Sequence, residues 1–379
     1  MKIVFTGGGS GGHFYPIIAV AEAVTDLVRE ERLIAPKLYY FAPSPFDQQA
    51  LFDNSIEFTR IPAGKLRRYF SLTNITDFIK TIVGISSALF ALFRIYPDVV
   101  FSKGGYASVP TVIAARVLRI PLIIHESDAK PGRANLLAAK QAAKIAISFD
   151  SAASYFPKRV QDRIARTGIP VRKALMRAEA EGAREYLGLA SGIPTVLILG
   201  GSQGSRKINE AVISALPELV SFANIIHQTG PGNLQEIQGL ARVALANVPH
   251  SERYHPFDYL SEIALQRASG AATVVVSRAG AGSIAEIALW KKPAILIPIP
   301  ESVSHDQRTN AYAFARTGAA VVLEEENLTP HLLASETRRI ATDPTIAADM
   351  GKKSAGFTDP DAARVIASAL LSISLSHES

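Results

Sequence analysis

Short apolar runs rich in β-branched and aromatic residues alternate along the chain with longer stretches in which apolar positions recur every three or four residues. This alternation predicts parallel β-sheets covered by amphipathic helices, and therefore an α/β protein. The predicted strands of the first half span residues 2–6, 37–42, 57–62, 98–102, 121–126 and 144–149. Those of the second half span residues 195–199, 223–228, 272–277, 294–298 and 319–323.

The two halves of the chain begin in the same way, with a strand, a glycine-rich loop and a helix. The loops are residues 7–12 and 200–204, and the helices begin at about residues 15 and 207. This repeat predicts two similar doubly wound domains, separated by the turn-forming stretch at residues 167–170. We therefore expect a first domain over residues 1–168, a second over 169–358, and a tail helix over 359–375 that packs back onto the first.

Composition narrows the class of protein. Of 379 residues, 48% are hydrophobic and 20% charged, which supplies packed cores and excludes a disordered chain. There is no cysteine, so disulfides, thiolate nucleophiles, cysteine-bound zinc and iron–sulfur clusters are excluded. The apolar run at the start is too short for a signal peptide, and no window reaches 18 apolar residues. We expect a cytoplasmic protein with no membrane-spanning segment.

The net charge of +6 is concentrated in the first half, where residues 1–165 hold 20 Lys and Arg against 13 Asp and Glu. Such a balance suits nucleic acid, phosphorylated substrates or an anionic membrane surface. Nucleic acid is disfavoured because the cations are scattered and no binding motif is present. Residues 81–93 form an uncharged run that suits either partial insertion into a membrane surface or an ordinary buried helix. The flanking cations are Lys65, Arg67, Arg68, Lys80 and Arg94.

A glycine run between a strand and a helix lets backbone amides and the helix dipole stabilise an anion. The first loop has neither the dinucleotide fingerprint nor the Gly-Lys-Ser/Thr of a P-loop, which disfavours a dehydrogenase or a P-loop enzyme. His13 follows this loop directly, at the sheet edge where doubly wound folds bind ligands. It is a candidate for a functional role, and the alternative is a capping or packing histidine.

The second half carries further candidates after its predicted strands. In the loop 277–283, Ser283 followed by Glu286 forms either a capping box or a site for phosphate and ribose. His305 and Gln307 open another helix and suit either sugar hydroxyls or an ordinary polar helix start. Asp359-Pro360-Asp361 matches the Asp-x-Asp of metal-dependent sugar transferases, but helix capping explains it better. We expect no metal and no cofactor.

Six motifs occur in an order that resembles the MurG family of N-acetylglucosaminyltransferases. They are residues 8–13, 102–108, 125–126, 168–172, 200–204 and 277–286. The resemblance implies a GT-B fold, with two Rossmann-like domains facing across a cleft. It also implies an inverting transfer from UDP-N-acetylglucosamine to the C4 hydroxyl of the muramic acid of lipid I, giving lipid II on the inner face of the cell membrane.

For this reaction we expect His13 to be the general base, because the attacking alcohol must lose its proton as the bond forms. The resemblance places Asp128 and Asn135 at the donor sugar, Arg172 and Ser202 at donor phosphate or uridine, and Glu286 at ribose. The other substrate-binding residues that it implies are Ser10, Gly11, Gly12, Gln203, Gly282, Ser283 and Gln307. Family members usually have asparagine where this chain has Asp128, and an ionised aspartate cannot donate a hydrogen bond.

Two other functions remain open alongside this one. A related GT-B lipid glycosyltransferase, such as a diacylglycerol glucosyltransferase, would share the donor site and differ in its acceptor. A non-catalytic nucleotide-sugar-binding protein would keep the donor site without turnover.

Overall fold

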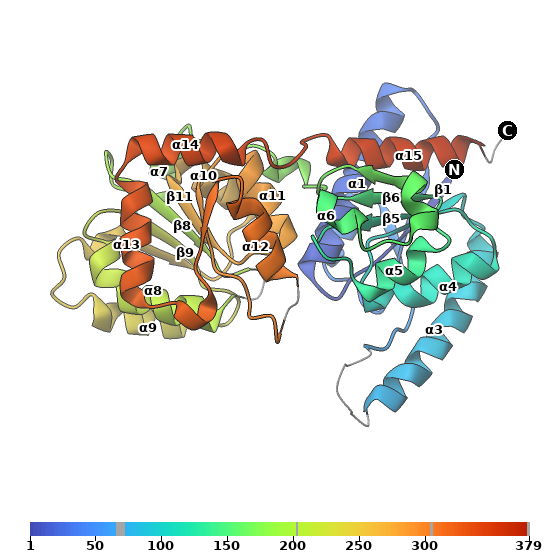
Figure 1. The fold of residues 1–379 in the computed structure, drawn as a ribbon, viewed down its shortest axis with the longest axis horizontal. Helices are drawn as coiled ribbons and strands as arrows, with labels where there is room; N and C mark the ends of the chain where they lie inside the picture. The colour runs from blue at the N-terminus through green and yellow to red at the C-terminus, as the bar shows by residue number, and fades with distance from the viewer. Residues whose placement is uncertain (66–72, 202–203, 304–305, 377–379) are drawn as a thin grey trace. The chain divides into compact units, whose positions relative to one another are not determined.

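A computed structural model of the chain describes residues 1–65, 73–201, 204–303 and 306–376. The chain divides into two compact units (Figure 1). Unit 1 comprises Met1–Arg172 together with the C-terminal segment from Asp359, and unit 2 comprises Lys173–Thr358. The chain therefore leaves unit 1 four residues beyond the expected boundary at residue 168, and it returns at the start of the expected tail helix.

Unit 1 is built on a sheet of seven parallel strands in the order β3-β2-β1-β4-β5-β6-β7. The strands are β1 (Lys2–Thr6), β2 (Lys37–Ala42), β3 (Ile56–Arg60), β4 (Val99–Ser102), β5 (Leu122–Glu126), β6 (Lys144–Ile147) and β7 (Ile164–Arg166). The central strands are buried on both faces, as expected where helices cover both sides of a parallel sheet.

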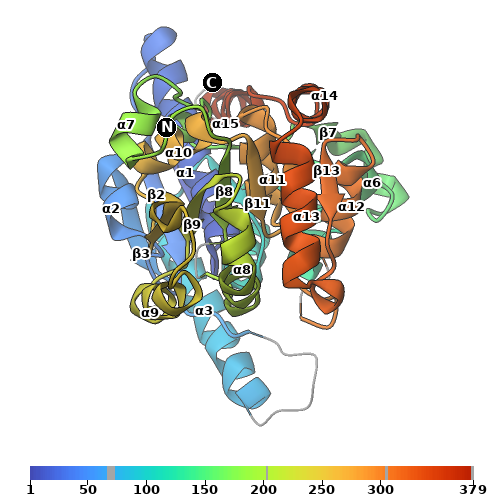
Figure 2. The same ribbon diagram turned by 90° about the vertical axis from the view of Figure 1, so that its left-hand side faces the viewer.

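Helices cover both faces of this sheet (Figures 1 and 2). One face packs on α1 and the C-terminal helix α15, and the other packs on α3, α4 and α5. The helices are α1 (Gly11–Glu30), α2 (Gln48–Asp53), α3 (Thr73–Ile95), α4 (Val109–Val117), α5 (Arg133–Ala139), α6 (Asp150–Ala153) and α15 (Ala362–Ser376), with 3₁₀ turns η1 (Tyr106–Ser108) and η2 (Lys158–Arg163). The chain returns to unit 1 because α15 buries Ile366, Leu370 and Leu371 in the same cluster as α1.

Unit 2 repeats the plan with six parallel strands in the order β10-β9-β8-β11-β12-β13. The strands are β8 (Thr195–Leu199), β9 (Asn224–Gln228), β10 (Tyr254–Phe257), β11 (Val274–Ser277), β12 (Ala294–Leu296) and β13 (Ala320–Val322). The helices are α7 (Ala183–Leu187), α8 (Arg206–Leu219), α9 (Leu234–Ala244), α10 (Glu262–Ala271), α11 (Ala281–Leu289), α12 (Gln307–Ala315), α13 (Pro330–Ala341) and α14 (Pro344–Ser354), with 3₁₀ turns η3 (Lys173–Leu175), η4 (Ser251–Arg253) and η5 (Glu325–Asn327). Apolar clusters fill both faces of this sheet.

The expected α/β class and the two parallel sheets are confirmed. Two strands at the sheet edges, β7 and β10, were not predicted from the sequence. β7 has only three residues, of which two are exposed, so it carries little hydrophobic signal. β10 contains Pro256, which lacks an N–H and is tolerated in a sheet chiefly on an edge strand. The expected helix start at residue 15 is wrong, since α1 begins at Gly11. Pro16 lies inside α1, beyond its first turn, where it lacks the N–H that would bond to the carbonyl of Gly12.

Candidate active site

Both units place a glycine loop at the carboxyl end of the strand where the order of the sheet reverses. In unit 1 this strand is β1, between β2 and β4, and in unit 2 it is β8, between β9 and β11. Ligands of doubly wound sheets bind at this position, because the loops on either side of the reversal separate there. Each unit is therefore expected to contribute binding groups at this edge of its sheet. We call the carboxyl end of β1 with the loop 7–12, and the carboxyl end of β8 with the loop 200–204, the two glycine edges.

In unit 1, His13 lies in the first turn of α1, and its side chain is half-buried. Its ring packs against the bare backbone of Gly105, where a Cβ atom would come within 3.4 Å of Nε2. Ser10 is the N-cap residue of α1, and its Oγ lies 2.9 Å from His13 Nδ1. Since Ser10 makes no side-chain cap hydrogen bond, its hydroxyl is committed to the histidine ring.

The ring of His13 is uncharged, so one of its nitrogens has a lone pair that can accept a proton. Burial, with the charge of Lys103 adding to it, lowers the pKa of His13 to about 3, so its ring is neutral at physiological pH. The Ser10 contact fits either tautomer; for Nε2 to act as a base, Nδ1 carries the proton and donates it to Ser10 Oγ. Gly11 and Gly12 lie in the same turn of α1 as His13; Gly11 is buried and Gly12 is exposed.

Two buried charged side chains, Lys103 and Glu126, lie next to this edge; they belong to the motifs 102–108 and 125–126, but the sequence assigned neither a role. Lys103 directly follows β4 and is only 2% exposed, while Glu126 ends β5 and is 3% exposed. Burial lowers the pKa of Lys103, and Glu126 and Asp128 oppose that shift. The signal that could have found the pair is the position of each charged residue, at the end of an otherwise apolar central strand.

The structure places Asn135 inside unit 1. It is 3% exposed, and its Nδ2 donates to the carbonyl of His125 at 3.0 Å and to Glu126 Oε2 at 2.9 Å. Its amide packs directly on Gly104, where a Cβ atom would lie 2.8 Å from it. Asn135 therefore joins the end of β5 to the loop that contains Gly104.

Arg172 ends unit 1, where its guanidinium lies 4.0 Å from the ring centroid of Tyr15. This cation–π contact holds the half-buried arginine beside α1, two residues along from His13. The domain boundary expected from the sequence placed Arg172 in the second domain. The structure places it in unit 1, where its contact with Tyr15 of α1 brings it near the first glycine edge.

In unit 2 the second glycine loop is shaped by close backbone approach. Gly204 has a φ of 75°, and a Cβ there would clash with the carbonyl of Thr229. The following residue, Ser205, caps α8 by accepting a hydrogen bond from the Ile208 N–H at 3.3 Å. Ser202 and Gln203, two of the expected substrate-binding residues, lie outside the described residues.

Helix α11 presents Gly282, Ser283 and Glu286 along one face, because residues three and four apart share a face of a helix. Its N-cap is Gly280, so Ser283 lies inside the helix and not at its cap. The capping-box interpretation of Ser283 and Glu286 is therefore wrong. A Cβ at Gly282 would meet open space, which leaves the N-terminal amides of α11 accessible to an anion.

Arg278 connects the two loops of unit 2; it lies in the motif 277–286, but the sequence assigned it no role. It directly follows β11 and is 9% exposed. Its Nη2 donates to Ser205 Oγ at 2.6 Å and pairs with Glu325 Oε2 at 2.6 Å, and its Nη1 donates to the carbonyl of Ile297 at 3.1 Å. One side chain thus fixes the start of α8, the end of β12 and η5.

Gln307 begins α12, and its Oε1 accepts a hydrogen bond from the Ile299 N–H at 3.2 Å. This bond holds the half-buried side chain at the carboxyl end of β12, on the same edge as the two loops of unit 2. His305 lies outside the described residues. A hollow of about 330 Å³ is lined by Arg308, Thr309 and Tyr312 of α12 and by Glu301.

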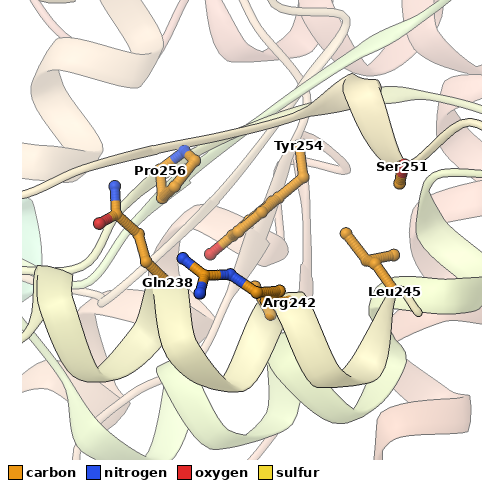
Figure 3. Close-up of a pocket in the computed structure, with 7 residues that line it drawn as sticks. Gln238, Arg242, Leu245, Ser251, Tyr254 and Pro256 are labelled. Atoms are coloured by element: carbon orange, nitrogen blue, oxygen red, sulfur yellow. The ribbon is translucent and has the colours of Figure 1, made fainter.

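A second hollow, of about 370 Å³, lies between α9 and the start of β10 (Figure 3). Gln238 and Arg242 line it from α9, and Tyr254 lies on its other side. Because Tyr254 begins β10, this hollow is at the amino end of the strand, away from the ligand-binding edge. It is not part of the candidate site.

The Asp-x-Asp motif is engaged locally, since Asp359 Oδ1 accepts a hydrogen bond from the Asp361 N–H at 2.9 Å. Within residues 1–65, 73–201, 204–303 and 306–376, no three His, Asp or Glu side chains are grouped to hold a metal ion. The described groups at both edges are amides, hydroxyls and single charged side chains, which suit phosphate and sugar groups.

Comparison with known proteins identifies relatives of both units. The profile of the glycosyltransferase family 28 N-terminal domain matches residues 3–147, and that of the glycosyltransferase family 28 C-terminal domain matches residues 195–366. A UDP-N-acetylglucosamine--N-acetylmuramyl-(pentapeptide) pyrophosphoryl-undecaprenol N-acetylglucosamine transferase of Treponema denticola is 34% identical over 98% of this chain and 97% of that protein. The enzyme of the same name from Legionella pneumophila is 40% identical over 88% of this chain and 86% of its own length.

Solved structures support the fold. The crystal structure of Acinetobacter baumannii MurG matches with a TM-score of 0.72 and 23% identity, over 98% of this chain and 99% of that chain. A UDP-GlcNAc 2-epimerase from Neisseria meningitidis, bound to UDP-GlcNAc, matches with a TM-score of 0.67 and 15% identity, over 98% and 100%. The expected GT-B fold is confirmed. Because an epimerase shares that fold, the fold alone does not choose the reaction.

Proposed function

The chain belongs to the MurG family within glycosyltransferase family 28, and we propose that its two glycine edges carry out that family's reaction. It is an N-acetylglucosaminyltransferase that uses UDP-N-acetylglucosamine and converts lipid I into lipid II in peptidoglycan synthesis. The observation that carries this conclusion is 34% identity over 98% of the chain with an enzyme of that name. This level of identity disfavours a diacylglycerol glucosyltransferase and a non-catalytic binding protein.

In unit 1, His13 is proposed as the general base. The C4 hydroxyl of the muramic acid unit attacks the anomeric carbon of the donor, the bond from that carbon to the diphosphate oxygen breaks, and UDP departs. The hydroxyl proton passes to His13 Nε2 as the new bond forms. Support comes from the neutral, half-buried ring at the carboxyl end of β1 and from the Ser10 contact that orients it.

In unit 2, the amides at the start of α11 and the loop 200–204 are proposed to hold the donor diphosphate. The departing UDP gains negative charge, which the fixed N–H dipoles at the start of α11 stabilise without reorganisation. Glu286, one turn further along α11, is placed to accept the ribose hydroxyls, and Gln307 the hydroxyls of the sugar. Ser202 and Gln203 are assigned to the same site from the sequence, and Arg172 to the phosphates.

The test of this function is the dependence of UDP release on both substrates. The purified chain is incubated with UDP-N-acetylglucosamine alone, with lipid I alone, and with both, and released UDP is measured. We expect release only with both, and its loss in His13→Ala, which should still bind UDP. Donor binding without release when both substrates are present would instead favour the non-catalytic interpretation.

Helix α3 of unit 1 is proposed to attach the protein to the cytoplasmic face of the cell membrane. One face, which includes Ala88 and Leu92, is buried in unit 1 and packs near α4. The other face is apolar and exposed, with Phe90 at 69% and Phe93 at 71%. Further exposed apolar residues along α3 are Ile75, Phe78, Ile79, Ile82 and Val83. The N-terminal part of the helix extends away from the sheet of unit 1 (Figures 1 and 2).

No window of the chain reaches 18 apolar residues, so no membrane-spanning segment is expected. In the part of the chain that the structure describes, Ile75–Ile95 alone meets the length and composition of a span, and 17% of its most apolar window is buried. The interpretation of 81–93 as an ordinary buried helix does not fit this exposure. We interpret α3 as a helix of unit 1 that lies in a membrane surface, because one of its faces belongs to the core of that unit.

Vesicle co-sedimentation tests this attachment. Phe90→Ser with Phe93→Ser should reduce binding to anionic vesicles at least tenfold, because two large apolar side chains no longer enter the bilayer. Phe52→Ser, at a 78% exposed site on α2, is the matched control and should bind as the parent does. Lys80→Glu with Arg94→Glu should weaken binding at low salt by about 1 kcal/mol per charge removed. Arg67 and Arg68 lie outside the described residues. Unchanged binding in the double serine variant would contradict the proposal.

A further inference from the structure

The carboxylate of Glu126, at the end of β5, accepts three hydrogen bonds. Its Oε1 accepts from the Asp128 N–H at 3.0 Å, and its Oε2 accepts from the Gly132 N–H at 3.0 Å and from Asn135 Nδ2 at 2.9 Å. The two backbone donors are at positions 128 and 132 of the loop that connects β5 to α5. One buried side chain therefore fixes the loop at two points and orients the helix that follows it.

Two charged side chains, Lys103 and Asp128, act on Glu126, and they come from different elements. Lys103 comes from the end of β4 and attracts the carboxylate, whereas Asp128, in the loop that it holds, repels it. From α5 comes the neutral amide of Asn135, while Arg133 and Lys140 of that helix and Lys144 at the start of β6 are exposed. The neighbouring His125 is held by the carbonyl of Gly168 at 2.9 Å, and burial lowers its pKa well below its usual range.

We propose that Glu126 is a positioning residue that holds the loop 127–132, and with it Asp128, in the shape needed at the donor sugar, and that Asp128 makes this hold weaken as pH rises. The role at the sugar rests on the proposed function. Asn135 takes part through Glu126, since both its bonds from Nδ2 are made within unit 1. Glu126 is only 3% exposed, so its effect at the sugar passes through the loop that it holds.

The direction of the pH effect follows from linkage. Burial and the charge of Asp128 raise the pKa of Glu126 from 4.5 to about 7, while Lys103 and the hydrogen bonds from Asp128 N–H and Asn135 oppose that rise. A loop that opens and hydrates the carboxylate returns its pKa towards 4.5, so the closed loop binds the proton more tightly than the open one. Closure is therefore strongest below about pH 4.5, weakens as pH rises through about 7, and levels off roughly one pH unit above that.

Hydrogen exchange of the amides of Asp128 and Gly132 measures this closure without substrate. In the parent protein, protection relative to the intrinsic exchange rate should fall by up to about 30-fold between pH 5.5 and 8. In Asp128→Asn the like charge is gone while the backbone bond to Glu126 stays, so the fall should be less than about tenfold and protection at pH 7.5 should be higher. Asp162→Asn removes an equal charge from the exposed surface of unit 1 and is the matched control.

Turnover separates positioning from simple support of the fold. Glu126→Gln replaces one acceptor oxygen with a donor, so the Gly132 amide should lose its protection and kcat should fall about 10- to 100-fold. The dissociation constant for UDP, which is bound by unit 2, should be unchanged. Asp162→Asn, the control on the exposed surface, should leave kcat unchanged.

Equal protection of both amides in the parent and in Glu126→Gln would overturn the proposal. So would identical pH dependence in the parent and in Asp128→Asn. An absence of lipid II synthesis by the parent chain would refute the proposed function instead, and the exchange measurements would still decide whether Glu126 holds the loop.

Discussion

Replacing Arg278 with methionine tests the claim that one buried side chain holds the donor-side loops of unit 2. The change removes the bonds to Ser205 and to the Ile297 carbonyl, and it removes the counter-charge of Glu325, whose side chain is 16% exposed. Breaking a buried ion pair by removing one partner costs about 3–5 kcal/mol, because the remaining charge stays buried and unpaired.

For a domain of the size of unit 2, each kcal/mol lowers the melting temperature by about 2–4 °C, so we expect a decrease of roughly 6–20 °C. Calorimetry of the full chain measures it. Arg278→Met with Glu325→Gln should recover part of the loss, because no unpaired charge then remains. Arg339→Met, which breaks an exposed 2.7 Å pair with Glu336, is the control and should lower the melting temperature by no more than about 4 °C.

Arg278→Met should also weaken UDP binding, because Ser205 follows the loop 200–204 directly and loses its link to β11. A decrease of less than about 2 °C, or a double variant no more stable than the single one, would refute the assignment of Arg278 as the connection between these loops.

Two further predictions concern residues at the two glycine edges. His13→Ala should lower kcat by about 10²-fold or more with UDP binding intact, and unaltered turnover would make His13 structural. Because the pKa of His13 is about 3, the ring stays neutral between pH 8 and 5, so the parent should show no loss of activity from this group over that range. Glu286→Ala should weaken UDP binding about 10- to 100-fold, as expected for hydrogen bonds to a charged group, and an unchanged dissociation constant would contradict the ribose role. Its melting temperature should stay within about 2 °C of the parent, since Gly280 and not Ser283 caps α11.

The fold followed from local patterns. The central strands, such as β1 and β8, are short apolar runs next to glycine loops, and their predicted bounds match the structure. The edge strand β10 could not be predicted because Pro256 breaks the pattern that identifies strands. Helix α3 was underestimated because Asp77 and Lys80 interrupt the uncharged run, although they lie one turn apart and pair at 3.6 Å.

The site was predictable only in part, for a related reason. His13 and the glycine loops are contiguous in sequence, so their chemistry is visible there. The group formed by Lys103, Glu126 and Asn135 is assembled from β4, β5 and α5, and no spacing along the chain shows that these elements meet. The bond between Arg278 and Ser205 likewise joins residues 73 positions apart.

The central claim is that this chain transfers N-acetylglucosamine to lipid I. It is tested most directly by incubating the purified chain with UDP-N-acetylglucosamine labelled in the sugar, in vesicles that contain equal amounts of lipid I and diacylglycerol, and separating the lipids. The account predicts label in lipid II alone, in an amount equal to the UDP released. Label in a glycosyl diacylglycerol, or UDP release without labelled lipid II, would contradict it.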